Sequence, residues 1–175
     1  MNKPSRINIR VDSSTLIGSG HIYRCMAIAE EAIRLGVSVR FIHAQIPGSL
    51  TREILKGVFE EIEIQYGIDL ESRSGTGPEW SNSLQTQDAS AVGGLLSKDF
   101  TEHVLVDHYG LTETWSQEIQ KYIQEDRLLF IHDQVDALAT VNSVHLGFLS
   151  QEEMLDKVLD SSGMRINESR HLSSC

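Results

Sequence analysis

The chain has 175 residues, a formal net charge of −10 at pH 7 and 40% hydrophobic residues, which suits one domain with a sizeable core. The acidic balance argues against nucleic acid or an anionic membrane surface as partner, because both attract basic proteins. No apolar run approaches the ~20 residues that span a bilayer, and no signal-peptide core opens the sequence, so we expect a cytoplasmic chain without membrane insertion. Cys25 and Cys175 lie far apart and favour two thiols over a disulfide.

Strand and helix patterns alternate along the chain, as a doubly wound sheet requires. Alternating apolar residues indicate strands, and apolar residues at helical spacing indicate helices. The expected elements are, in chain order, a strand at 7–11, a helix at 21–35, a strand at 37–43, a helix at 50–56, a strand at 61–65, a long loop at 66–82, a helix at 86–96, a strand at 104–106, a helix at 112–124, a strand at 128–131 and an apolar segment at 144–149. We therefore expect a Rossmann-like α/β fold over residues 1–150, with a mostly parallel sheet covered by helices on both faces. Residues 151–175 are expected to form a polar tail, either helical or disordered.

The segment between the first strand and the first helix carries the strongest functional signal. Gly18 and Gly20 give this loop backbone freedom, and they deliver His21 to the start of the helix. An imidazole there can act as acid or base near neutral pH, and the free backbone N–H groups can hold an anionic or polar sugar group. The loop matches neither the dinucleotide-binding nor the P-loop spacing. A glycine-rich turn with a helix-capping histidine is the structural alternative.

Titratable side chains follow three of the expected strands. These are Asp12 and His21 after the first, Asp107, His108 and Tyr109 after the fourth, and His132 and Asp133 after the fifth. The carboxyl ends of parallel strands meet at one edge of the sheet, where open α/β folds bind ligands. We therefore predict a site at this edge. The histidine and cysteine spacings are not those of a metal site.

Each of these residues also has a structural interpretation. Asp12 could cap a loop through an Asx turn, and we expect His108 to point into solvent rather than to act in catalysis. Tyr109 could be a packed aromatic, and Arg24 either a surface charge or a clamp on a ligand oxyanion. His43 also ends a strand, but nothing near it in the sequence indicates a task.

Over about residues 7–131 the chain resembles a known family, in the family's order and spacing. The residues that carry the first motif are Arg10, Asp12, Ile17-Gly18-Ser19-Gly20-His21, Arg24-Cys25 and Ala29. Together they resemble the opening signature of the nucleotide-sugar hydrolases of pseudaminic acid biosynthesis, which are related to glycosyltransferases with the GT-B fold. Residues 107–111 followed by Trp115 resemble the second motif, and Trp80 with residues 87–89 resembles the segment between.

This resemblance implies a single N-terminal domain of the GT-B type and a specific reaction. The reaction is hydrolysis of UDP-2,4-diacetamido-2,4,6-trideoxy-β-L-altropyranose to UDP and free sugar, with no metal or other cofactor. His21 would be the general base that activates water, with Asp12 and Tyr109 as further catalytic residues. The substrate-binding residues implied are Arg10, Gly18, Ser19, Gly20, Arg24, Asp107 and His108.

The sequence departs from the family in two places. Ile131-His132-Asp133 stands where the family has Ile-Asp-Asp. The family's enzymes also have a second domain with most of the UDP contacts, which we expect to be absent here. The first hypothesis is therefore a hydrolase that is either truncated or completed by another polypeptide. The expected partner is a separate chain that supplies the nucleotide-binding domain, or a further copy in a homo-oligomer. The alternatives are a non-catalytic sugar-binding or assembly module and the acceptor domain of a glycosyltransferase.

Overall fold

The computed structural model describes residues 3–15, 17–65, 80–132 and 143–145. The elements in these ranges are β1 (Ser5–Val11), α1 (Gly20–Arg34), β2 (Ser38–Ala44), α2 (Thr51–Leu55), β3 (Glu60–Ile64), α3 (Asn82–Gly94), β4 (Thr101–Asp107), α4 (Glu113–Ile119), the short 3₁₀ helix η2 (Glu125–Arg127), β5 (Leu128–His132) and β6 (Ser143–His145). No helix among the described residues is both long enough and apolar enough to cross a membrane.

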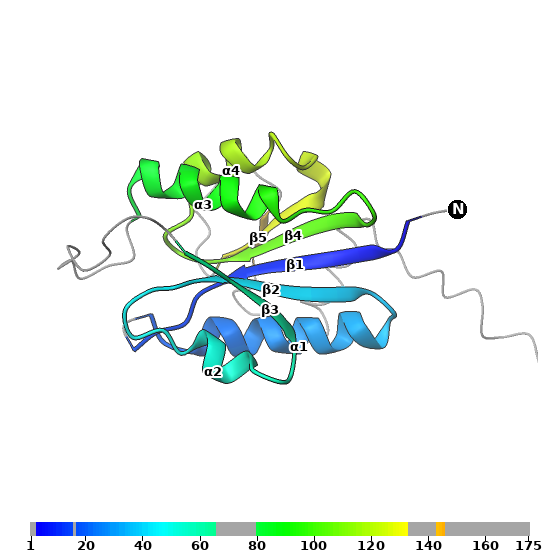
Figure 1. Cartoon of the computed structure of the whole chain (residues 1–175), viewed down its shortest axis with the longest axis horizontal. Coiled ribbons are helices and arrows are strands. Elements are labelled where there is room, and N and C mark those ends of the chain that lie inside the picture. Colours follow the sequence, from blue (N-terminus) through cyan, green and yellow to red (C-terminus); the bar gives the residue numbers. More distant parts are fainter. Residues whose placement is uncertain (1–2, 16, 66–79, 133–142, 146–175) are drawn as a thin grey trace, which may run out of the picture.

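The strands form a single sheet in the order β3-β2-β1-β4-β5-β6, and every neighbouring pair is parallel. This order confirms the predicted Rossmann-like α/β fold. The chain builds outward from β1 in one direction, then returns to place β4 on the other side of β1 (Figure 1). The order therefore reverses between β1 and β4, and open α/β folds bind ligands outside the carboxyl ends of strands at such a point.

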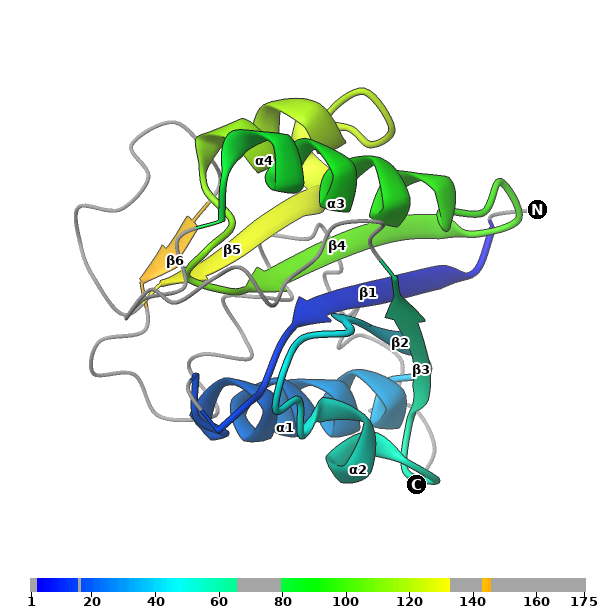
Figure 2. The ribbon, with the colours of Figure 1, turned by 60° about the vertical axis from the view of Figure 1, so that its left-hand side comes forward.

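Helices cover both faces of the sheet, as predicted. In Figures 1 and 2, α1 and α2 lie on one face, and α3 and α4 lie on the other. Side chains of a strand alternate between the two faces. Ile9 and Leu105 accordingly belong to the apolar cluster under α1, whereas Val104 and Val106 belong to the cluster under α3 and α4. This alternation also decides to which face the polar residues at the strand ends belong.

Two helix boundaries differ from the prediction by more than two residues. Helix α3 begins at Asn82 rather than at residue 86, because the Ser81 hydroxyl caps it by accepting a hydrogen bond from the backbone N–H of Leu84 at 3.4 Å. Helix α4 ends at Ile119 rather than at residue 124. After Ile119 the α-helical pattern gives way to a tighter turn, in which the N–H of Tyr122 donates to the carbonyl of Ile119, three residues earlier, at 2.9 Å.

Several expectations concern residues outside the described part of the chain. Strand β6 begins within one residue of the expected apolar segment, but residues 146–149 are not described. His132 is the last residue of β5. Asp133, Cys175, most of the expected loop at 66–82 and the tail at 151–175 lie outside the described residues, so the predictions on them stay predictions.

Candidate functional site

A small pocket lies where the strand order reverses, at the carboxyl ends of β1 and β4. It is lined by Asp12, Ile17, His21, Asp107, His108 and Tyr109. Five of these six residues are those that the sequence predicted to gather at this edge. The hollow takes in about 200 Å³, including space open to solvent. It lies on the edge of the sheet where open α/β folds bind ligands.

His21 and Asp107 form a closely bonded pair at this pocket. His21 is the second residue of α1 and is 8% exposed, and its Nδ1 lies 2.6 Å from Asp107 Oδ1. Arg24 Nη2 also lies near Nδ1, at 3.1 Å, but the carboxylate contact is much shorter. Two lone pairs would repel each other at 2.6 Å, so a proton lies between Nδ1 and Oδ1, and in the neutral ring Nδ1 carries it. Nε2 then holds the lone pair. No hydrogen bond to Nε2 occurs among the described residues, so the ring can act as a base.

The Asp107 carboxylate is held by three neighbours on α1. Arg24 donates from Nε to Oδ2 at 2.8 Å and from Nη2 to Oδ1 at 2.7 Å. Cys25 lies with its sulfur 3.6 Å from Oδ2, and burial and the Asp107 charge raise the pKa of the thiol. The carboxylate is therefore fixed before any ligand binds. Arg24 is thus paired with Asp107, and its contact with a ligand stays a prediction.

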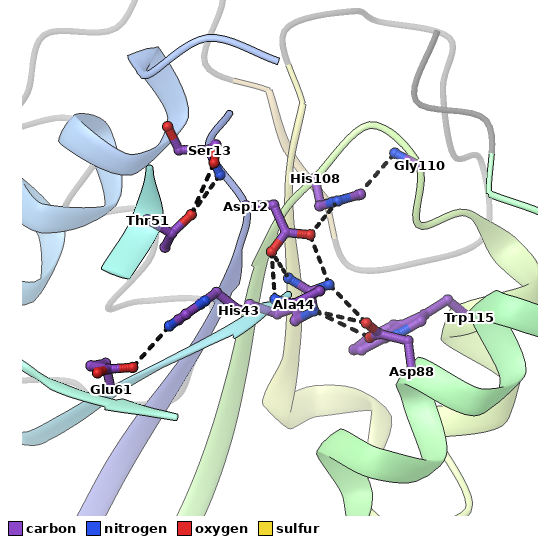
Figure 3. Close-up of polar contacts among 11 residues, drawn as sticks. Asp12, Ser13, His43, Ala44, Thr51, Glu61, Asp88, His108, Gly110 and Trp115 are labelled. Carbon is purple, nitrogen blue, oxygen red and sulfur yellow. Dashed lines mark hydrogen bonds and ion pairs between the residues drawn. The ribbon is translucent and has the colours of Figure 1, made fainter. Parts of the chain in front are cut away.

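Asp12 receives four hydrogen bonds, which leave its carboxylate fully occupied (Figure 3). Arg10 donates to both oxygens at 2.7 and 2.9 Å, the backbone N–H of Ala44 donates to Oδ1 at 2.8 Å, and His108 Nε2 lies 2.9 Å from Oδ2. Burial by itself would raise the pKa of Asp12, but Arg10 and His108 outweigh it and hold the pKa well below its usual range. Asp12 is thus an ionised anchor and not the capping residue of an Asx turn.

Arg10 lies beneath the pocket rather than on its wall. Its side chain is completely buried and forms a second ion pair with Asp88 of α3, with Nη2 2.7 Å from Oδ2. Trp115 of α4 donates from Nε1 to the other Asp88 oxygen at 2.6 Å. The structure therefore puts Arg10 at the centre of a buried network that joins β1 to both helices of this face. Direct contact between Arg10 and a substrate stays a prediction that this placement does not favour.

His108 and Tyr109 take places that the residue patterns did not indicate. The expectation that His108 points into solvent is wrong, because the residue is 5% exposed and bonded to Asp12. Its ring also meets Trp80 edge-on, with ring centroids 4.8 Å apart. Tyr109 is not a buried packed aromatic, because it is 51% exposed. Its ring contacts His21 in a T-shaped arrangement at 4.6 Å between centroids.

The loop from Asp12 to Gly20 is pinned at several backbone positions. The Ser13 N–H donates to the Thr51 hydroxyl at 2.8 Å, and Gly18 donates to the carbonyl of Ser14 at 2.8 Å. Gly18 has φ +86°, a conformation that favours glycine. Ser19 is the residue before α1, and its side chain makes no capping hydrogen bond. Gly20 opens the helix, and a Cβ on it would meet open space.

Residue patterns in the sequence do not indicate some of the residues on which this geometry depends. Asp88, Trp80 and Trp115 were noted only for their resemblance to a motif, and the buried ion pair between Arg10 and Asp88 was not anticipated. His43, in contrast, lies away from the pocket, buried and with Nε2 2.8 Å from Glu61 Oε2.

Comparisons with known proteins add little to this description. No family model and no curated protein matches the sequence. Among solved structures, the crystal structure of MurG from Acinetobacter baumannii is similar, with 13% sequence identity and a TM-score of 0.43. The match covers 81% of this chain and 44% of that chain, so this chain spans less than half of that neighbour's length. A likeness of this size carries no argument, and the assignment of the fold rests on the sheet topology.

Proposed function

We propose that this chain is the base-carrying, sugar-binding domain of a nucleotide-sugar hydrolase. The observation that carries this proposal is the His21–Asp107 pair, which presents an imidazole lone pair at a pocket on the ligand-binding edge of the sheet. The motif resemblance supports the finer assignment to UDP-2,4-diacetamido-2,4,6-trideoxy-β-L-altropyranose. MurG offers no support for this substrate.

In the proposed reaction, water attacks the anomeric carbon of the sugar. His21 Nε2 takes the proton from the attacking water, the bond between the anomeric carbon and the phosphate oxygen breaks, and UDP leaves with the electron pair. His21 then carries a positive charge next to the Asp107 carboxylate. A fixed carboxylate in this position stabilises the imidazolium and keeps the correct ring nitrogen facing the substrate. Tyr109, in contact with the His21 ring, is proposed to limit the ring's movement and to contact the sugar.

The charges around the pocket favour the sugar over the diphosphate as its occupant. Arg24 is paired with Asp107, and Arg10 is shared between two buried carboxylates. Neither arginine is thus available to neutralise phosphate oxygens. Hydroxyl and acetamido groups carry no charge, so they need no cation at the pocket. The proposal therefore places the nucleotide outside it, against a partner chain or a second copy of this chain.

The test is release of UDP from the candidate nucleotide sugar by the purified chain. We expect His21→Ala to lower turnover by about 10²–10⁴, which is the usual contribution of a general base. Asp107→Asn should lower turnover by at least about 10², because it weakens the hold on the productive tautomer. Asp99→Asn is the matched control: Asp99 is exposed and precedes β4, so this variant should behave as the wild-type chain.

Other outcomes favour the alternatives. Sugar binding without turnover by the folded wild-type chain would favour a binding module. Transfer of the sugar to an added acceptor, with the same loss in His21→Ala, would favour the acceptor domain of a glycosyltransferase. Turnover that survives His21→Ala in a folded protein contradicts the base assignment.

A further inference from the structure

We propose that His108 is a positioning residue of the candidate site and is held in its Nε2–H tautomer. The pocket then contains two histidines in opposite tautomers, of which only His21 can accept a proton. The kinetic part of this inference rests on the proposed function, whereas the part on tautomers concerns the chain alone.

The tautomer of His108 follows from its two hydrogen bonds. The backbone N–H of Gly110 donates to His108 Nδ1 at 3.0 Å. An amide N–H can only donate, so Nδ1 must be the unprotonated nitrogen. The ring proton is therefore on Nε2, where it is donated to Asp12 Oδ2 at 2.9 Å. Both nitrogens are occupied, and neither is left to exchange a proton with a ligand.

His21 has the opposite arrangement. Its Nδ1 lies 2.6 Å from Asp107 Oδ1 and 3.1 Å from Arg24 Nη2. We assign the proton to Nδ1 because the much shorter contact is to a carboxylate, which can only accept, and this leaves the lone pair on Nε2. The two histidines bond different aspartates because the His21–Asp107 and His108–Asp12 pairs belong to opposite faces of the sheet. Val11 lies opposite Asp107 in the register of β1 and β4, and both residues belong to the face of α1. Asp12 and His108 are the next residues along, so they turn to the face of α3.

The contacts of His108 indicate what it positions. One end of the ring is fixed to Asp12, which Arg10 anchors in the buried network of Asp88 and Trp115. The other end holds the backbone of Gly110. Tyr109 lies between these two points in the chain and contacts the His21 ring. His108 thus connects the rigid interior to the turn that carries Tyr109, and through Tyr109 to the base.

The first test is spectroscopic and needs no substrate. Long-range proton–nitrogen correlation spectra of the isotope-labelled whole chain at neutral pH distinguish protonated from unprotonated ring nitrogens. His21→Gln and His108→Gln assign the signals by the ones that each variant loses. We expect an unprotonated Nδ1 in His108 and an unprotonated Nε2 in His21. The same tautomer in both rings, or averaged signals in His108, would overturn the proposal.

The second test applies one substitution to both histidines. Glutamine can donate and accept hydrogen bonds but cannot act as a base. We expect His21→Gln to lower kcat by at least about 10², and His108→Gln to lower it by no more than about tenfold and to keep the wild-type pH profile. His108→Phe keeps a ring next to Trp80 but loses both hydrogen bonds. It should lower kcat by up to about 10², as a misplaced site does.

Two kinds of failure can be told apart. A folded His108→Gln that loses as much activity as His21→Gln, or that changes the pH profile, makes His108 a proton carrier and overturns the proposal. If the wild-type chain releases no UDP, the proposed function fails. The spectra of the wild-type chain then still decide the role of His108.

Discussion

The polar residues of the site are sorted by a single rule, the alternation of side chains along β1 and β4. Val11 and Asp107 belong to the face of α1, so Asp107 meets His21, Arg24 and Cys25 of that helix. Asp12 belongs to the other face and meets Arg10. Two aspartates at the same edge of the sheet therefore take separate tasks. One orients the candidate base, and the other anchors the buried network.

The pH dependence of stability tests the role of Asp12. Its folded pKa is depressed below the ordinary value of 3.8, so its contribution is complete above that value and is lost as pH falls towards the folded pKa. Asp12→Asn should destabilise the chain by about 3–5 kcal/mol near neutral pH, the usual cost of breaking a buried ion pair. Urea unfolding at a series of pH values should show this difference shrinking below the ordinary pKa.

The exposed Asp99→Asn is the control for this series, because it changes the same chemical group without breaking a buried ion pair. It should alter the free energy of unfolding by less than about 0.5 kcal/mol at neutral pH. A difference between wild type and Asp12→Asn that stays constant down to the acid transition would contradict the depressed pKa of Asp12.

The sequence could predict which residues share the edge, but not which of them touch. Strand ends and helix starts follow from local patterns, so Asp12, His21 and Asp107 were placed together correctly. That Asp107, and not Asp12, bonds His21 depends on the register between β1 and β4. Two strands almost a hundred residues apart in the chain set this register, and no local pattern contains it.

At the scale of elements, the packing of α3 against α4 holds the helix that carries Asp88. At Gly93 of α3, the Tyr122 ring from the segment after α4 packs against the helix. A Cβ built on Gly93 would lie 2.3 Å from Cγ of the Tyr122 ring. The ring thus lies directly over the glycine. No local pattern in the sequence indicates this role of Gly93, because the need for a small residue comes from a neighbour in space rather than in sequence.

Two adjacent glycines of α3 offer a matched test of this packing. Gly93→Ala should destabilise the chain by about 1–3 kcal/mol, because the added methyl group displaces the Tyr122 ring. Gly94→Ala meets no atom within 4 Å and should be neutral or stabilise by up to about 1 kcal/mol. Chemical denaturation of both variants measures the difference. Equal effects would mean that Tyr122 does not pack over Gly93 in solution.

At the scale of the whole molecule, the net charge and the paired arginines at the pocket both disfavour binding of a diphosphate there. The chain carries a net charge of −10, and the two arginines at the site are paired with carboxylates. A diphosphate would thus meet a negative protein without a free guanidinium at the described pocket. Under the proposed function, recognition of the nucleotide would therefore come from another surface.

Binding of UDP alone tests whether the chain by itself recognises the nucleotide. We expect a dissociation constant weaker than about 1 mM, corresponding to less than about 4 kcal/mol of binding free energy. Added salt should leave this affinity unchanged or improve it slightly, because salt screens repulsion between like charges. Isothermal titration calorimetry at two ionic strengths measures both quantities, with the free sugar as the companion ligand. Submillimolar affinity for UDP that weakens with salt would show that this chain carries a cationic nucleotide site of its own, and the partner would then not be needed to hold the nucleotide.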